Sequence, residues 1–154
     1  MDKKLLNQQS QHWESNFSSK PEMFGLEPSY SAKKSLEIFK KFNINNILEL
    51  GAGLGRDTIY FAKNNIKVYA LDFSPCAIDT IIKKSKKLGL EKFITAEVFD
   101  IRKDFSFIEK NFDCCYSHML YCMALTESDL EELNKKIHLK LKGDGINIYT
   151  VRNT

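Results

Sequence analysis

The chain has 154 residues, of which 43% are hydrophobic and 28% are charged, so we expect one globular domain with an ordinary core. No apolar run approaches the roughly 20 residues that a membrane-spanning helix needs, and the first residues lack the apolar segment of a signal peptide. These features predict a cytoplasmic protein without a membrane partner.

The net charge of +3 is spread along the chain, and its densest cluster is formed by the four lysines between residues 83 and 87. Isoleucine and leucine alternate with these lysines, as on a helix with one solvated face. No aromatic side chains are interleaved with them, so we expect no nucleic-acid partner.

The four cysteines show neither C-x-x-C spacing nor the density of a disulfide scaffold. Cys114 and Cys115 are neighbours in an expected strand, so their side chains point to opposite faces and do not readily bind one metal. We expect reduced thiols and no metal. A thiol site for a soft metal or for arsenic stays open as an alternative.

The first 43 residues predict helices joined by an apolar loop. A weakly apolar helical pattern covers residues 5–17 and breaks at residues 18–21, and a second helix runs from Ala32 to Asn43. The loop between them, 22–30, is rich in large apolar side chains. Such a loop either packs into the core or folds over a pocket as a lid, and the sequence favours neither.

Residues 44–154 alternate between strand and helix patterns. Strands are expected at 44–50, 66–71, 93–99, 112–117 and 146–151. Helices are expected to begin at Asp57, at a Ser74-Pro75 cap and at a Thr126–Asp129 capping box, and the last of them to end at Gly143. This alternation predicts an α/β fold with a doubly wound parallel sheet.

In an open parallel sheet, ligands bind outside the carboxyl ends of the strands. Glycine or polar residues close four of the expected strands at that edge: Gly51, Gly53 and Gly55 after the first, Asp72 after the second, Asp100 after the third, and Ser117 with His118 after the fourth. We therefore expect the binding site there.

The spacing of these residues indicates an adenosyl ligand without phosphates. Asp72 follows Gly51 by 21 positions (72 − 51), which suits a carboxylate that accepts hydrogen bonds from both ribose hydroxyls. Dinucleotide loops have the form G-x-G-x-x-G, whereas Arg56 stands at the third glycine here. Asp57 in the first helical turn would also repel a pyrophosphate. A nicotinamide-dependent oxidoreductase is therefore disfavoured.

The stretch Glu49-Leu50-Gly51-Ala52-Gly53-Leu54-Gly55 resembles the glycine motif of class I S-adenosylmethionine-dependent methyltransferases. The order of elements over 44–151 is similar to their Rossmann-like fold. Residues 116–126 and 148–154 further resemble small bacterial and archaeal methyltransferases near the tellurite-resistance type. The resemblance implies S-adenosylmethionine as the cofactor and a small molecule as the methyl acceptor.

The resemblance also implies a role for each matching residue. Main chain at Glu49, Gly51, Ala52 and Gly53 would approach the methionine part of the cofactor, and Asp72 would hold the ribose. Asp100, the Ile101 amide and Phe73 would contact adenine, and main chain at Ser117 or His118 would accept the ammonium group. Simpler roles stay open: Asp72 as a helix cap, Asp100 paired with Arg102 or Lys103, Phe73 as core, and Gly55 as a helix-packing residue.

The acceptor side is less defined. His118 is the one titratable side chain at a strand end that could act as a general base for an oxygen or nitrogen acceptor. Trp13, Phe24 and Tyr30 are candidate lid residues, because aromatic faces favour a cationic sulfonium, and Tyr121 is a further candidate on the substrate side.

The family sheet has strand order 3-2-1-4-5-7-6, whereas this chain ends after the fifth strand. We therefore expect a 3-2-1-4-5 sheet without the final antiparallel hairpin. Two interpretations follow: a fragment of a longer protein, which we favour, or a dimer that covers the exposed edge of strand five. A non-catalytic cofactor-binding or interaction module is the alternative to an enzyme.

Overall fold

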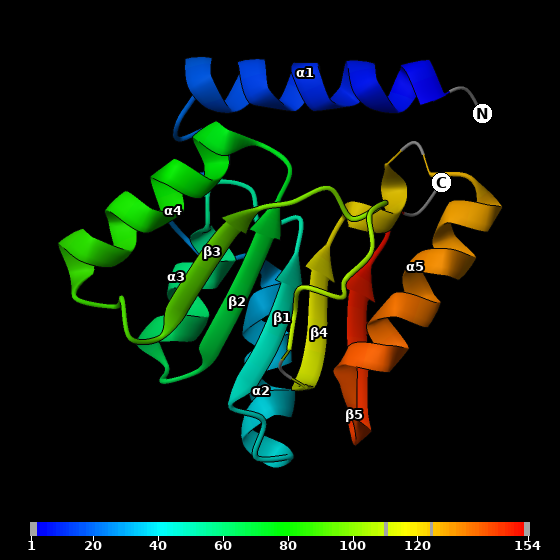
Figure 1. Cartoon of the computed structure of the whole chain (residues 1–154). Helices are drawn as coiled ribbons and strands as arrows, with labels where there is room; N and C mark the ends of the chain where they lie inside the picture. The colour runs from blue at the N-terminus through cyan, green and yellow to red at the C-terminus, as the bar shows by residue number, and fades with distance from the viewer. Residues whose placement is uncertain (1–2, 110, 124, 153–154) are drawn as a thin grey trace.

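The computed structural model describes residues 3–109, 111–123 and 125–152. Ala124, Asn153 and Thr154, which belong to the stretches of finer resemblance, lie outside them. Five strands form one sheet in the order β3-β2-β1-β4-β5, and every neighbouring pair is parallel (Figure 1). The strands are β1 Asn46–Leu50, β2 Lys67–Asp72, β3 Ile94–Val98, β4 Phe112–His118 and β5 Leu141–Thr150. The expected doubly wound sheet is confirmed.

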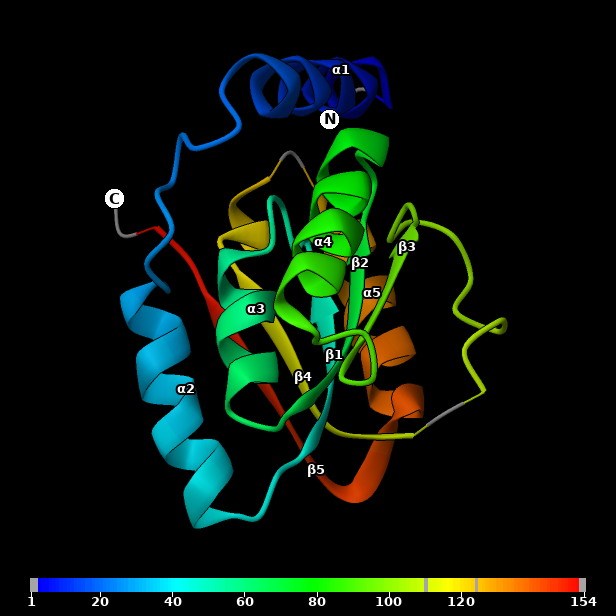
Figure 2. The ribbon, with the colours of Figure 1, turned by 90° about the vertical axis from the view of Figure 1, so that its left-hand side faces the viewer.

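Helices cover both faces of this sheet, and one further helix lies across its end. Figure 2 shows α2 (Tyr30–Lys41) and α3 (Arg56–Lys63) on one side and α5 (Glu127–Lys140) on the other. The helix α4 (Pro75–Leu88) packs on the same side as α3, and α1 (Lys3–Ser19) lies over the carboxyl ends of the strands (Figure 1).

Strand β1 is buried on both faces, as a central parallel strand must be. Ile47 packs into the cluster under α2, α3 and α4, whereas Leu48 and Leu50 pack into the cluster under α5. The first cluster includes Phe61, whose ring meets that of Tyr116 edge-on at 5.0 Å between centroids. Helix α2 lies within the N-terminal region expected at residues 1–43, and its buried hydrophobic residues belong to the same core cluster as those of the sheet.

Two helix starts follow the expected chemistry. The Ser74 hydroxyl accepts the Ala77 amide at 3.1 Å, with Pro75 in the first turn of α4. Thr126 and Asp129 form the expected capping box of α5, with the Asp129 amide 3.1 Å from the Thr126 hydroxyl. No helix in the described part of the chain is long and apolar enough to cross a membrane.

The expected helix boundaries are wrong at two places. Helix α1 runs from Lys3 to Ser19 and so ends within the expected break at residues 18–21, two residues later than the expected helical pattern. Helix α5 ends at Lys140 instead of Gly143, and β5 begins at once. The β4–β5 register moves from Phe112↔Leu141 to Cys114↔Ile146, so Gly143 and Gly145 belong to a β-bulge. In the sequence, a glycine in a bulge cannot be distinguished from a glycine that ends a helix. The short 3₁₀ helix η1 (Leu120–Cys122) was not expected.

Gly55 begins α3 in a left-handed conformation, with φ of 79°, and a Cβ there would lie 2.5 Å from Ile81 Cγ1. We predict that Gly55→Ala lowers the free energy of unfolding by about 2–4 kcal/mol, since it combines overpacking with an unfavourable φ. Gly89→Ala is the matched control, because Gly89 has φ of 65° with open space around it; it should cost only about 1 kcal/mol. Equal losses in urea denaturation would contradict the packing role.

Candidate active site

The glycine turn after β1 lies where the strand order reverses, between β1 and β4. Gly51 and Gly53 have φ of 70° and 54°, which favour glycine. The Gly51 and Ala52 amides donate to the Leu71 carbonyl at 2.8 and 3.1 Å, which ties the turn to β2. A Cβ on Gly51 would reach within 3.1 Å of Leu120, so glycine keeps space open at the carboxyl edge.

A cavity of about 80 Å³, partly open to solvent, lies at this edge. Its wall combines α1, the ends of β1, β2 and β3, and the segment around η1. The lining residues are Gln9, Ser10, Trp13, Gly51, Asp72, Phe73, Phe99, Asp100, Ile101, Arg102, Leu120, Met123 and Leu125. Six of the expected site residues therefore meet in one pocket: Trp13, Gly51, Asp72, Phe73, Asp100 and Ile101.

Asp72 is a buried carboxylate at the end of β2. Its Oδ2 accepts the Gly53 amide at 2.8 Å and its Oδ1 accepts the Ser74 amide at 2.9 Å. Burial raises the pKa of Asp72, while these amide hydrogen bonds oppose the rise. The carboxylate thus caps α4 and braces the glycine turn, yet each oxygen has a second lone pair for a ligand hydroxyl.

Asp100 pairs with Arg102, the alternative that the sequence left open. The Asp100 Oδ1 accepts the Arg102 backbone amide at 3.0 Å and its Nε at 2.9 Å. Burial alone would raise the pKa of Asp100, but the hydrogen bonds and charge of Arg102 outweigh it and lower the pKa. Asp100 still lines the pocket, so the pair holds the carboxylate at the wall.

Helix α1 closes the pocket from above, and the sequence did not reveal how it docks. Phe17 is buried against Leu54 and Ala77. Glu14 accepts the Ser74 hydroxyl and lies 3.4 Å from the Cys76 amide, at the N-terminus of α4. An anion at this end of a helix is favoured by the exposed amides and the helix dipole. Only the tertiary structure brings Glu14 to a helix 60 residues away.

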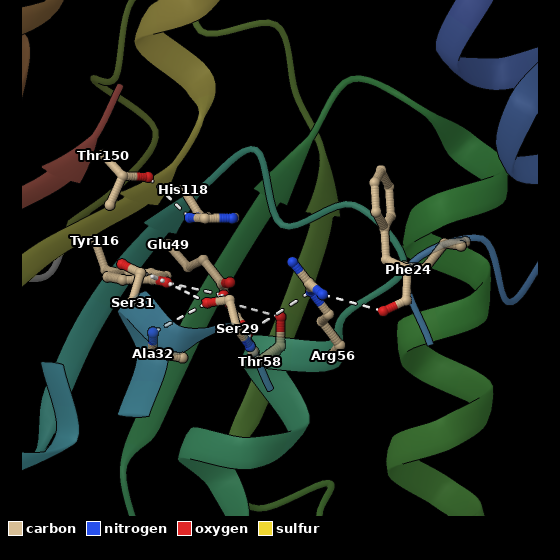
Figure 3. Close-up of polar contacts among 12 residues, drawn as sticks. Phe24, Ser29, Ser31, Ala32, Glu49, Arg56, Thr58, Tyr116, His118 and Thr150 are labelled. Carbon is tan, nitrogen blue, oxygen red and sulfur yellow. Dashed lines mark hydrogen bonds and ion pairs between the residues drawn. The ribbon is translucent and has the colours of Figure 1, made fainter. Parts of the chain in front are cut away.

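The segment between α1 and α2 is fastened to the first turn of α3. The Arg56 guanidinium donates to the Phe24 carbonyl at 3.0 Å and lies 5.4 Å from the Phe24 ring (Figure 3). The Phe24 ring is 6.2 Å from that of Trp13, but Phe24 does not line the pocket. Tyr30 is 75% exposed and also lies outside it.

Asp57 anchors the other end of this segment. Its buried carboxylate accepts the Ser29 amide and hydroxyl, both at 2.7 Å, and the Tyr116 hydroxyl at 2.8 Å. Burial and the nearby Asp57 raise the pKa of Tyr116, so this hydroxyl stays a donor. From the sequence, Asp57 is expected only to begin a helix and to repel a pyrophosphate, whereas the structure gives its carboxylate three hydrogen bonds from two residues.

The residues at the end of β4 lie beside the glycine turn, since Ser117 pairs with Leu50. Ser117 Oγ is buried and has no hydrogen-bond partner among the described residues. The His118 Nδ1 lies 2.8 Å from the Thr150 hydroxyl. Burial lowers the pKa of His118, Asp57 opposes this and Arg56 adds to it, so the net shift favours the neutral imidazole. Neither residue lines the main pocket.

Glu49 and Tyr121, also expected in the site, do not line the pocket. Glu49 is 3% exposed, and its carboxylate accepts the Thr58 hydroxyl at 2.6 Å. Tyr121 stacks on Tyr149 at 4.5 Å and donates to Asn134 at 2.9 Å, on the side of α5.

All four cysteines are free thiols. Burial raises the pKa of Cys114 to about 12 and also raises that of Cys115, which makes both poor nucleophiles. The described residues contain no group of three His, Cys, Asp or Glu side chains that could hold a metal ion.

A parallel sheet in this order, with a glycine turn after β1 and acids after β2 and β3, defines the Rossmann-like methyltransferase class. The chain belongs to the methyltransferase domain family, whose model matches residues 47–145. The expected class I resemblance is confirmed.

The curated relatives are matched over only part of their own length. Phosphoethanolamine N-methyltransferase 1 from Triticum aestivum is 35% identical over 129 residues, covering 82% of this chain and 22% of that protein. The Zea mays enzyme of the same name is 31% identical over 130 residues, with the same coverage. The chain thus spans about a fifth of the length of these relatives.

Solved structures share the fold at low identity. The DhpI–SAH complex has a TM-score of 0.70 and 18% identity, covering 97% of this chain and 70% of that one. TehB from Haemophilus influenzae has a TM-score of 0.68 and 20% identity, covering 89% and 44%. The glycopeptide N-methyltransferase MtfA complexed with S-adenosyl-L-methionine has a TM-score of 0.65 and 21% identity, covering 81% and 50%.

We predict that Glu14→Gln loosens the docking of α1, because it removes the anion at the α4 N-terminus. The emission of Trp13, the single tryptophan, should shift to longer wavelength, and stability should fall by about 1 kcal/mol. Glu91→Gln, at an exposed position, is the control. Unchanged emission and stability in Glu14→Gln would show that the contact does not hold the helix.

Glu49 provides a test of pH dependence. Burial raises the pKa of Glu49 well above its usual 4.5, with Thr58 opposing and Asp57 and Asp72 adding. The folded chain therefore holds this proton to higher pH than the unfolded chain, and the wild type loses stability as pH rises above about 4.5. Glu49→Gln, which cannot ionise, should gain stability relative to wild type from pH 4 to pH 8 in urea denaturation. A constant difference would contradict the shift.

Proposed function

We propose that this chain binds S-adenosylmethionine and transfers its methyl group to a small-molecule acceptor. The observation that carries the proposal is the pocket in which Gly51, Asp72 and Asp100 meet beneath α1. Family membership supports the same conclusion. Structural neighbours are described as complexes with S-adenosyl-L-methionine, sinefungin and SAH.

The residues present fit such a cofactor. The buried Asp72 carboxylate suits a ribose diol, and Phe73, Phe99 and Ile101 offer apolar surface for adenine. The main chain at Glu49, Gly51, Ala52 and Gly53 would approach the methionine part of the cofactor, and that at Ser117 or His118 would accept its ammonium group. Asp100 and Ile101 would contact adenine. Trp13 carries the lid proposal, since it lines the pocket, whereas Phe24, Tyr30 and Tyr121 do not.

When bound, S-adenosylmethionine supplies a methyl group activated by a sulfonium. The chain would contribute by aligning the acceptor and excluding water, which can account for much of the rate in an in-line displacement. His118 as a general base remains a prediction. Because the curated relatives are named phosphoethanolamine N-methyltransferases, an amine is the first acceptor to test, ahead of thiols and metalloid oxyanions.

Three further proposals concern location, assembly and an alternative function, and their support is less direct. A cytoplasmic location is consistent with four free cysteines. A dimer through the β5 edge is supported by the half-exposed Tyr149 and Val151. The alternative function is a non-catalytic cofactor-binding or interaction module, which would use the same pocket.

Calorimetry with S-adenosylmethionine and S-adenosylhomocysteine tests the cofactor. Both should bind, and Asp72→Ala should weaken binding roughly 10- to 100-fold, since it removes hydrogen bonds to a charged group. Asp144→Ala, on the exposed bulge, is the matched control. Heat with NAD alone would refute the proposal. Methyl transfer to phosphoethanolamine, thiols or metalloid oxyanions then distinguishes an enzyme from a binding module, because binding without any turnover supports the module.

A further inference from the structure

The Thr150 hydroxyl joins the last residue of β5 to the end of β4. Thr150 pairs with His118 across the two strands. Its Oγ1 accepts the Met119 amide at 3.0 Å and lies 2.8 Å from His118 Nδ1 (Figure 3). One side chain thus contacts the backbone and the imidazole at the carboxyl edge of the sheet.

The backbone that Thr150 holds is in an unfavourable conformation. Met119 has φ of 62°, a left-handed value that side chains other than glycine adopt rarely. Met119 precedes η1, which supplies Leu120 to the pocket. Such strain persists only where the surroundings impose it, and it is concentrated at functional sites.

Counting donors and acceptors assigns the imidazole tautomer. A threonine hydroxyl has one proton and two lone pairs. The Met119 amide uses one lone pair, and within the described residues the hydroxyl proton has no acceptor other than His118 Nδ1. If Nδ1 carried the proton instead, the Thr150 proton would be left without a protein partner, which is costly for a half-buried group.

We infer that Thr150 is a positioning residue, which donates to His118 Nδ1 and keeps His118 in the tautomer with its proton on Nε2. The inference deepens the proposed function and rests on it for its catalytic meaning. Figure 3 shows the far edge of the ring directed away from Thr150. No described residue accepts a hydrogen bond from Nε2.

This tautomer changes what His118 can do for the acceptor. A neutral imidazole with its proton on Nε2 donates a hydrogen bond in that direction and cannot take up a proton there. The substrate class that fits is therefore an acceptor that presents an oxygen or nitrogen lone pair to His118 and loses any proton of its nucleophile to a group other than His118. The base role that we expected from the sequence would require the opposite tautomer.

Nitrogen-15 NMR of the whole chain tests the assignment directly. Spectra at pH 8 distinguish protonated from unprotonated ring nitrogens, and His118→Asn identifies the His118 signals. We expect an unprotonated Nδ1 and a protonated Nε2 in the wild type, with and without S-adenosylhomocysteine. A protonated Nδ1 would overturn the inference, whether or not the chain proves to be an enzyme.

Substitutions test the role of Thr150. Thr150→Val should populate the other tautomer and speed hydrogen exchange of the Met119 amide, whereas Thr150→Ser should keep the wild-type pattern. Thr95→Val, on the exposed side of β3, controls for loss of a strand hydroxyl. With turnover of phosphoethanolamine, Thr150→Val should lower kcat about tenfold, the value of one hydrogen bond, with the KM for S-adenosylmethionine unchanged. A wild-type tautomer in Thr150→Val would contradict the role, and if that variant does not fold, the wild-type spectrum still decides.

Discussion

The buried carboxylate of Asp57 is the constraint on which the arrangement around the site depends. A buried carboxyl group is costly unless its oxygens are hydrogen-bonded, and here three donors, from Ser29 and Tyr116, converge on it. Together with Asp57, these partners join three parts of the chain: the start of α2, the first turn of α3 and the middle of β4. The carboxylate therefore fixes where the N-terminal segment meets the sheet.

On the N-terminal side of Ser29, the chain crosses the carboxyl ends of the strands and is held there by three contacts. Arg56 holds the Phe24 carbonyl, Phe17 is buried beside the glycine turn, and Glu14 meets the start of α4. Helix α1 thereby becomes a wall of the pocket, with Trp13 in it.

The sequence predicted the elements that depend on local chemistry. The strand order followed from alternation and from the family resemblance, and the caps at Ser74 and Thr126 followed from residue type. The prediction was wrong where one residue type occurs in two kinds of structure. Glycine ends helices in many proteins, but Gly143 belongs to a bulge in β5. For Asp100, pattern alone could not distinguish a ligand contact from the pair with Arg102.

The sequence by itself determined the sheet, the glycine turn and the acids that close β2 and β3, because hydrophobic period, glycine spacing and the parallel topology bring strand ends to one edge. Only the tertiary structure decided the partners of Glu14, Asp57 and Thr150. Those contacts join segments far apart along the chain, and hydrogen bonds of this kind depend on ångström-scale placement. That placement is set by packing, which leaves no periodic signal in the sequence.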